Sequence, residues 1–377
     1  MSQWIKTKLG EIVILNYGKA LKAQDRNAGS IHVYSSGGFT GWHNKALINE
    51  QGIIIGRKGT VGKAYLTYGP FWCIDTAYYI LPNPSKYDFV FLFYLLKTLG
   101  LEELNEDSAV PGLNRDTAYS QEILLPSLPE QKAIASVLSS LDDKIDLLHR
   151  QNKTLESMAE TLFRQWFDVD SNDEWQEKNV LDIFTLVGGG TPKTSVAEYW
   201  TDEIPWISGG DISAAHQGYL YSTEKSISLA GLQNSSAKLL PKNSTVISAR
   251  GTVGKYALLA RDMAFSQSNY GIVSKIGSYP FFIYLLVGFI VDDLLTAAYG
   301  SVFDTITTRT FESVNLKFPS LNSIEKFNEE ISPIFSKKET NTQQIKTLEN
   351  LRDTLLPKLM NGEVRVQYAE EAIASVA

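Results

Sequence analysis

The sequence of 377 residues contains little of the chemistry that metal sites and disulfide frameworks use. It has one cysteine, Cys73, and four histidines. A single cysteine excludes an intrachain disulfide and a cysteine-based zinc site. The histidines show neither the HExxH pattern nor another paired-ligand spacing, so ordinary polar positions are the simpler interpretation. We therefore expect no metal on this chain.

Nucleotide-binding and methyltransferase motifs are missing as well. The segment Gly56–Gly62 has glycines at i, i+3 and i+6, which is not the GxGxxG of a dinucleotide site. Ala64 and Tyr256 follow the two Gly-Lys pairs, where a P-loop needs Ser or Thr. No Asn-Pro-Pro-Tyr or Asp-Pro-Pro-Tyr motif of adenine methyltransferases occurs. We expect no catalytic residue and no cofactor on this chain.

Long apolar runs and a cationic excess are also absent. The run Phe281–Val291 stops at two aspartates, which is short for a bilayer span, and the N-terminus lacks the apolar core of a signal peptide. A cytoplasmic protein without membrane contact is therefore expected. The net charge is −7, from 35 Lys and Arg against 42 Asp and Glu. Taken alone, that charge argues against nucleic acid.

The sequence does contain an internal repeat. Trp4–Ile12 matches Trp175–Ile183 at an offset of 171, and Gly59–Lys63 recurs letter for letter at an offset of 192. A third match, Leu125–Leu128 with Phe318–Leu321, has an offset of 193. Matches in the same order indicate two copies of one unit of about 180–190 residues. The growth of the offset places an insertion before the Gly-Thr-Val-Gly-Lys segment of the second copy.

Each copy begins with a globular part, at residues 1–128 and 171–321, that is rich in Gly, Tyr, Ser and Thr. Short β-branched and aromatic runs punctuated by Gly, Pro and Asn predict strands, and two longer apolar segments predict buried helices. The expected strands are Ile31–Tyr34, Gly52–Gly56, Cys73–Ile80, Ser244–Ser248 and Asn269–Val273, and the expected helices are Phe89–Leu101 and Phe281–Leu295.

Each copy ends with a long helix, at residues 129–170 in the first copy and within 322–377, which also includes a C-terminal tail, in the second. Apolar residues recur there in alternating steps of four and three, which is typical of a coiled coil. The seam residues are Ile134, Leu138, Leu141, Ile145, Leu148, Asn152, Leu155 and Leu162 in the first helix, and Phe327, Ile331, Ile334, Ile345, Leu348 and Leu355 in the second.

A helix of about 40 residues is about 60 Å long, more than one small globule buries. We therefore expect an α+β protein with two mixed α/β domains separated by two long helices. The helices form an antiparallel coiled coil, and the repeat has pseudo-two-fold symmetry. Asn152 then acts as a register device. The alternative is two independent helices, each packed on its own domain.

The Gly-Thr-Val-Gly-Lys loops are the strongest candidate sites. Glycines bring backbone N–H groups to the surface, threonine offers a hydroxyl, and flanking cations neutralise phosphates. Duplication favours an extended polyanion over a small phosphate ligand, and a purely structural hairpin is the competing interpretation. The candidates are Arg57, Lys58, Thr60 and Lys63 in copy one, and Arg250, Thr252 and Lys255 in copy two.

Other polar loops are candidates for base contacts in a DNA groove, with a plain surface turn as the alternative. The two copies carry different polar residues at these places, as expected of modules with different targets. The residues are Ser36, Gly38, Thr40, Trp42, His43, Asn114 and Arg115 in copy one, and Ser208, Asp211, Gln267, Ser268, Asn269, Thr308 and Arg309 in copy two.

The combination resembles the specificity (S) subunit of type I DNA restriction–modification systems over essentially the whole chain. The resemblance rests on the repeated loop, on Leu125–Ile134 with its Leu-Pro-Ser-Leu-Pro-Glu-Gln sequence, on Ile204–Asp211 and on Leu356–Gly362. The second copy departs from the pattern, because Asn322-Ser-Ile-Glu lacks the Pro-Glu-Gln sequence of the first.

The resemblance implies that each globule is a target recognition domain for one half of a split double-stranded DNA site, with the helices as spacers. It also implies two modification (methyltransferase) subunits and restriction subunits as partners, which carry S-adenosylmethionine, ATP and Mg. The chain itself would be non-catalytic. Two alternatives are a coiled-coil scaffold carrying ligand- or protein-binding domains and a stand-alone DNA-binding regulator. Given the net charge, we expect the isolated chain to bind DNA weakly.

Overall fold

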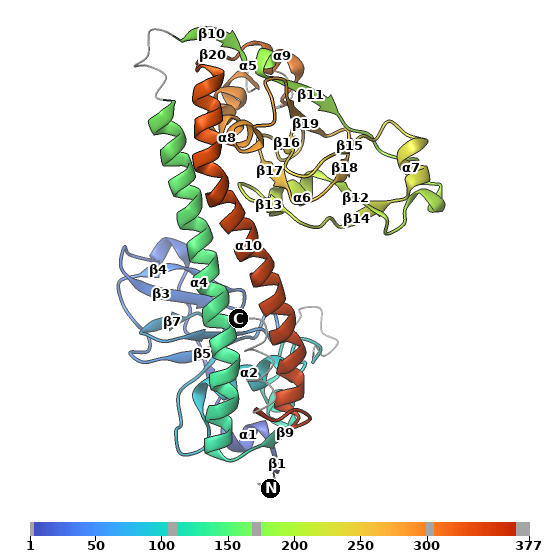
Figure 1. Cartoon of the computed structure of the whole chain (residues 1–377). Coiled ribbons are helices and arrows are strands. Elements are labelled where there is room, and N and C mark those ends of the chain that lie inside the picture. Colours follow the sequence, from blue (N-terminus) through green and yellow to red (C-terminus); the bar gives the residue numbers. More distant parts are fainter. Residues whose placement is uncertain (1–3, 105–111, 168–174, 299–304, 367–377) are drawn as a thin grey trace. The chain divides into compact units, whose positions relative to one another are not determined.

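The computed structural model describes residues 4–104, 112–167, 175–298 and 305–366 (Figure 1). The chain divides into two compact units. The first comprises Met1–Leu148 and Gln344–Ala377, and the second comprises His149–Gln343. Each unit therefore combines one globule with one half of each long helix, whereas the sequence analysis treated the helices as separate segments.

Three small sheets build the globule of the first unit. Their strand orders are β2-β8-β5-β6, β4-β3-β7 and β1-β9. The strands are β1 (Ile5–Lys8), β2 (Asn16–Tyr17), β3 (Ile31–Ser35), β4 (Gly38–His43), β5 (Gly52–Gly56), β6 (Ala64–Thr67), β7 (Phe71–Cys73), β8 (Ala77–Ile80) and β9 (Glu122–Leu125). The short helices are α1 (Leu9–Ile12), η1 (Ala23–Asp25), α2 (Phe89–Thr98) and α3 (Arg115–Tyr119).

The apolar segments of this globule fold largely as their patterns predict. All five residues of β5 are buried, which explains its unbroken apolar run. Asp88 caps α2 by accepting bonds from the N–H groups of Val90 and Phe91. The single strand predicted over Cys73–Ile80 is wrong. A turn interrupts it, with the Ala77 N–H donating to the Ile74 carbonyl (3.1 Å), so β7 and β8 join different sheets.

The second globule also has three sheets, ordered β11-β19-β16-β17-β13, β14-β12-β18-β15 and β10-β20. The strands are β10 (Gln176–Asn179), β11 (Phe184–Gly188), β12 (Ile204–Ile207), β13 (Tyr219–Leu220), β14 (Lys225–Ile227), β15 (Leu239–Leu240), β16 (Thr245–Ser248), β17 (Tyr256–Leu259), β18 (Met263–Phe265), β19 (Asn269–Ser274) and β20 (Asn315–Phe318). The helices are α5 (Val180–Ile183), η2 (Ala197–Tyr199), α6 (Gly209–Ala214), α7 (Leu229–Gln233), α8 (Pro280–Ala298) and α9 (Thr308–Glu312).

Helix α8 is longer than the apolar run Phe281–Val291 identified in the sequence. It continues through Asp292 and Asp293 to reach 19 residues. By length and composition alone it could cross a membrane, so the expectation that this segment is too short was wrong. Half of its apolar window is nevertheless buried inside the second unit. This is the packing of a core helix in a globular domain.

The two long helices are α4 (Leu128–Trp166) and α10 (Leu321–Met360). In the second unit Asn341 donates to the Asn152 side chain (3.0 Å), and the Trp166 indole donates to Glu330 (2.9 Å). Residue numbers therefore rise along one helix as they fall along the other. In the first unit Ile345, Leu348 and Leu355 join the core that contains the first five seam residues of α4. The expected antiparallel coiled coil is confirmed, with its two halves in different units (Figure 1).

The seam of the second unit departs from the prediction. Leu155, Leu162 and Ile334 are only partly buried. Their neighbours Phe163 and Phe335 are buried instead, and both pack against α8, with the Phe335 ring stacked on Phe281 (4.4 Å). A straight helix drifts relative to a strict heptad, so its apolar face turns. Here that face serves both the partner helix and the globule.

Candidate nucleic-acid interface

The loop between β5 and β6 is held by backbone hydrogen bonds. The Gly56 N–H donates to the Lys63 carbonyl (3.0 Å), and the Gly62 N–H returns a bond to the Gly56 carbonyl (2.9 Å). Further along, the N–H groups of Arg57 and Lys58 both donate to the Thr76 carbonyl (2.9 and 3.0 Å). This network fixes the loop while leaving the Lys58 and Lys63 side chains exposed.

The second copy repeats this network at the offset of 192 residues. Ser248 N–H donates to the Lys255 carbonyl (2.7 Å), and Gly254 N–H donates to the Ser248 carbonyl (2.9 Å). Ala249 and Arg250 share the Ser268 carbonyl (2.9 and 3.2 Å). The repeat seen in the sequence is therefore a repeat of backbone hydrogen bonds between different side chains.

Glycine is required in these loops by backbone conformation. Gly59 and Gly62 have φ of 83° and 76°, and Gly251 and Gly254 have 79° and 81°. Residues with a Cβ rarely adopt this left-handed region. The structural-hairpin interpretation is thus correct for the glycines, and it leaves Lys58, Lys63, Arg250 and Lys255 exposed for other roles.

A second turn lies beside each loop. In copy one, a Cβ placed on Gly37 would lie 3.7 Å from the Thr60 hydroxyl oxygen. In copy two, a Cβ placed on Gly209 would lie 3.5 Å from the Thr252 hydroxyl oxygen, and Thr252 donates to the Gly209 carbonyl (3.2 Å). The two candidate loops of each copy therefore meet at one place.

Cations gather around this place in the first unit without acidic partners. The guanidinium groups of Arg57 and Arg115 both lie over the Tyr17 ring, at 5.3 and 5.4 Å from its centroid. Among the described residues, no ion pair involves these arginines, Lys58 or Lys63. Unpaired cations beside exposed backbone suit a phosphate-bearing partner.

The loop cations of the second unit are also without ion pairs in the described parts of the chain. Arg250, Lys255 and Arg309 are all exposed. The segment before Arg309 is tied to the loop, because the Ile306 N–H donates to the Ala249 carbonyl (3.0 Å). Burial and the charge of Lys255 lower the pKa of His216 at this loop. This imidazole is therefore biased toward its neutral form.

Comparison with known proteins identifies the family. The profile of the "Type I restriction modification DNA specificity domain" matches residues 1–157 and 172–351. The chain belongs to this family. Family membership assigns it DNA sequence specificity and places it among recognised non-catalytic subunits.

Two curated relatives are specificity subunits of type I restriction enzymes. The MjaIX specificity subunit of Methanocaldococcus jannaschii is 28% identical over 302 residues, covering 74% of this chain and 69% of the relative. The HindI specificity subunit of Haemophilus influenzae is 23% identical over 378 residues, covering 78% and 81%. In fold, the chain is similar to a type I S subunit from M. genitalium, with a TM-score of 0.66, 16% identity and coverage of 95% and 96%.

Several polar residues predicted to contact DNA are occupied within the protein. Asn269 is 1% exposed and donates to Ser266 (2.9 Å), so it cannot reach a groove. His43 is also buried and accepts a bond from the Asn27 N–H (3.1 Å). Ser36 is buried in its turn, with its N–H donating to the Thr76 hydroxyl (3.3 Å). Because all three side chains are buried, the assignment of these residues as direct DNA contacts was wrong.

Helix caps account for three further candidates. The Ser208 and Asp211 side chains form the capping box of α6, with 2.7 Å between their oxygens. The Asn114 side-chain oxygen caps α3 by accepting from the Asp116 N–H (2.8 Å). These side chains already form hydrogen bonds within the protein. Buried Gly38 (φ 93°) shapes the β3–β4 turn, where an added Cβ would meet Tyr65.

The remaining candidates are placed at or near the loops. Thr40 and Trp42 are exposed on β4, and Thr308 is exposed at the start of α9. Gln267 is exposed and accepts a bond from the Thr191 hydroxyl, while Ser268 supplies the carbonyl that anchors the second loop.

The sequence analysis missed an aromatic cluster on the β3–β4 hairpin. Phe39 and Trp42 are 52% and 50% exposed, with ring centroids 5.3 Å apart. His32 lies 4.5 Å from the Trp42 ring. Strict alternation would place Phe39 and Trp42, three residues apart, on opposite faces of β4. The irregular register between β3 and β4, with His32 opposite Trp42, establishes the cluster. Exposed aromatic rings of this kind suit contact with bases.

Proposed function

We propose that the chain reads a bipartite DNA target, with each globule contacting one half-site. The observation that carries the proposal is the duplicated loop, where the same backbone network presents unpaired cations in both copies. Lys63 and Lys255 occupy equivalent positions and would meet phosphates, which orient a protein on DNA without reading sequence. Side chains that differ between the copies would then read different bases.

We further propose that α4 and α10 set the separation of the half-sites and scaffold the partner subunits. These partners are two methyltransferase subunits, which supply S-adenosylmethionine chemistry, and restriction subunits, which use ATP and Mg. The complex would act in the cytoplasm. A net charge of −7 fits this division, because the partners would then supply much of the phosphate-binding surface.

The decisive experiment is methylome sequencing of a host with and without this gene and its partner methyltransferase. The expected result is one split motif whose methylation depends on the chain. In parallel, the purified complex should enrich the same motif from a random duplex pool. Enrichment of no split sequence would contradict the proposal and favour a scaffold for other ligands. A chain that reads DNA but never co-purifies with a methyltransferase would be a stand-alone regulator.

The spacer role has its own test. Inserting four residues into both α4 and α10 lengthens each helix by about 6 Å. The two half-site sequences should stay the same while the number of bases between them changes. A change in the half-site sequences, with the spacing constant, would contradict this role for the helices.

A further inference from the structure

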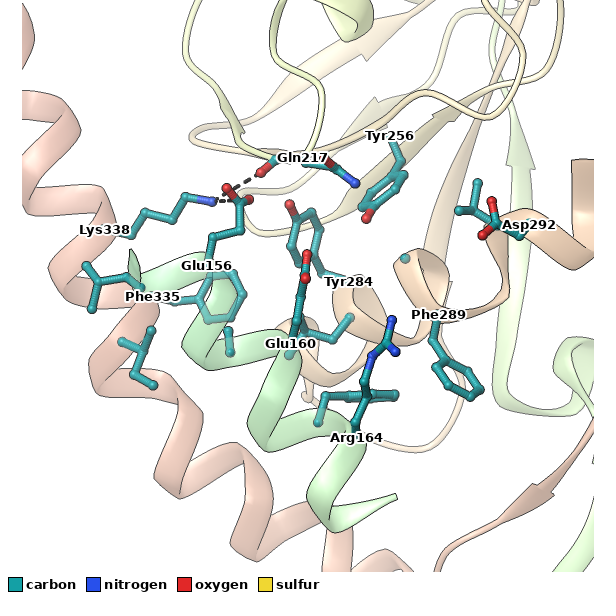
Figure 2. A pocket seen from close by; sticks show the side chains of 17 residues that line it. Glu156, Glu160, Arg164, Gln217, Tyr256, Tyr284, Phe289, Asp292, Phe335 and Lys338 are labelled. Carbon is teal, nitrogen blue, oxygen red and sulfur yellow. Dashed lines mark hydrogen bonds and ion pairs between the residues drawn. The ribbon is translucent and has the colours of Figure 1, made fainter. Parts of the chain in front are cut away.

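The second unit contains a pocket that the DNA-binding role leaves unused (Figure 2). Its volume is about 230 Å³, and it lies where the C-terminal half of α4 and the N-terminal half of α10 meet α8 and the start of β17. Aromatic side chains and charged groups line it together. The labelled charged residues are Glu156, Glu160, Arg164, Asp292 and Lys338.

The charges of this pocket do not balance. Glu156 is ion-paired with Lys338 (2.7 Å), which also donates to the Gln217 carbonyl (3.1 Å). In the described parts of the chain, Glu160, Asp292 and Arg164 have no ion pair. Glu160 and Asp292 thus carry two negative charges against the single positive charge of Arg164, and one negative charge is left over.

Two buried tyrosines line the same space. Tyr284 is 4% exposed, and no described residue forms a hydrogen bond with its hydroxyl. Burial raises the pKa of Tyr284, and Tyr256, Glu156 and Glu160 raise it further. Burial also raises the pKa of Tyr256 to about 12, reinforced by Glu160, Glu156 and Asp292 against the opposing bond from Gln217. Both hydroxyls are thus neutral, and that of Tyr284 is free to accept a hydrogen bond.

The backbone around Tyr256 is shaped at two positions that are locally unfavourable. Gly288 lies inside α8, where glycine is less favourable than alanine, and an added Cβ would lie 2.4 Å from the Tyr256 hydroxyl oxygen. Gln217 has φ of 59°, and its N–H donates to the Tyr256 carbonyl (3.0 Å). Both features keep Tyr256 at the pocket wall. Such local costs are typical of functional sites.

We propose that this pocket binds an organic cation, an ammonium or guanidinium group on a short apolar stem. A cation there would balance the excess carboxylate and donate to the unpartnered Tyr284 hydroxyl. Its stem would contact Phe289 and Phe335, and aromatic faces attract cations. The source is either a free amine or a lysine or arginine side chain of a partner protein.

The first test measures binding to the purified full chain by calorimetry. The probes are butylamine and agmatine, with 1-butanol as the neutral match of butylamine and butyrate as the anion. We expect saturable binding of the two cations and none of 1-butanol or butyrate. Equal binding of 1-butanol would show a purely apolar cavity, and preferential binding of butyrate would show that Arg164 and Lys338 dominate. Either result would overturn the proposal.

The second test uses variants. Tyr284→Phe removes a hydroxyl that has no partner, so the chain should keep its thermal stability. It should bind the cations about tenfold more weakly, because the loss of one hydrogen bond to a charged group changes the affinity by about this factor. Glu160→Gln keeps the shape of an exposed side chain and should weaken binding by a similar factor. Glu329→Gln, an exposed carboxylate on α10 outside the pocket, is the matched control. Unchanged affinity in both pocket variants would overturn the site.

A third arm separates the two sources of the cation. The binding of butylamine is measured with and without the partner subunits. Undiminished binding in the assembled complex indicates a free amine as the ligand. Binding that is lost on assembly and recovered when partner lysines and arginines are neutralised indicates a partner side chain. If butylamine binding is still lost after the partner lysines and arginines are neutralised, the partner merely covers the pocket. That result would overturn a partner side chain as the occupant.

Discussion

The two loop copies share their backbone hydrogen bonds but differ in what surrounds them. In the first copy Arg57 stacks on Tyr17 and donates to the Asp75 carbonyl (2.7 Å), whereas Ala249 stands at the equivalent position of the second. Thr60 is exposed without a hydrogen-bond partner in the described structure, whereas Thr252 is bonded to the neighbouring turn. The comparison separates the parts that build the loop from those that can vary with the target.

The largest expected effect is a loss of stability when the loop glycines are replaced by alanine. A Cβ on Gly62 would lie 2.3 Å from the Glu102 backbone nitrogen, whereas on Gly254 it would lie 2.9 Å from the flexible Leu295 side chain. Both alanine variants should lose about 1–2 kcal/mol of stability, because alanine is strained in the left-handed conformation. Gly62→Ala should lose about 1–3 kcal/mol more, because the neighbouring backbone cannot move aside easily. Thermal unfolding should show a larger loss of stability for Gly62→Ala than for Gly254→Ala. Equal losses would mean that only conformation matters.

The next prediction concerns a substitution that makes the first copy resemble the second. Arg57→Ala removes the cation–π contact and the bond to Asp75, at a cost of about 1–2 kcal/mol. The loop should survive, because Ala249 keeps the equivalent backbone bond to Ser268. Denaturant unfolding measures the cost, and amide exchange of Arg57 and Lys58 reports on the loop. Loss of protection at both amides would show that the side chain holds the loop in place.

A smaller difference is expected between the threonines. Thr252→Val breaks the bond to the Gly209 carbonyl and the contact with Ser248, which should lower the stability of the second unit by about 0.5–1.5 kcal/mol. Thr60→Val should leave stability unchanged within about 0.5 kcal/mol. Chemical denaturation of both variants decides the matter. A loss of similar size for Thr60→Val would remove this contrast between the copies.

The smallest effect concerns the lysines, which should behave alike in the assembled complex. Lys63→Ala and Lys255→Ala should each reduce the slope of log affinity against log salt by about 0.9, with sequence preference intact. Lys153→Ala, an exposed lysine on α4 remote from both loops in sequence, serves as the control. A slope that stays constant in both loop variants would limit the loops to a structural role.

Predictions from sequence were most successful where the signal is local or periodic. The alternation of four and three residues predicted both long helices, and identical letters at Gly59–Lys63 predicted two equivalent loops. The prediction failed where an element is ended by a distant partner. At the turn between β7 and β8 the Thr76 carbonyl accepts bonds from two loop amides, which no pattern within Cys73–Ile80 reveals.

Site residues were harder to predict, because polar type does not show what a side chain already binds. Asn269 and Asp211 have side chains suited to base contacts, yet one is buried and the other is engaged in a helix cap. Conversely, Tyr17 was overlooked because it lies far in sequence from Arg57 and Arg115, the two cations that converge on its ring.

By itself, the sequence determined the duplicated organisation, the two long helices, the glycine-dependent loops and the family, since all of these depend on short-range identity or on a regular period. Only the tertiary structure decided which polar side chains remain free, how Phe163 and Phe335 replace the expected seam residues, and where buried Tyr284 meets unbalanced carboxylates. Those properties arise from contacts between residues distant along the chain. Burial and charge pairing follow from such contacts and not from residue type.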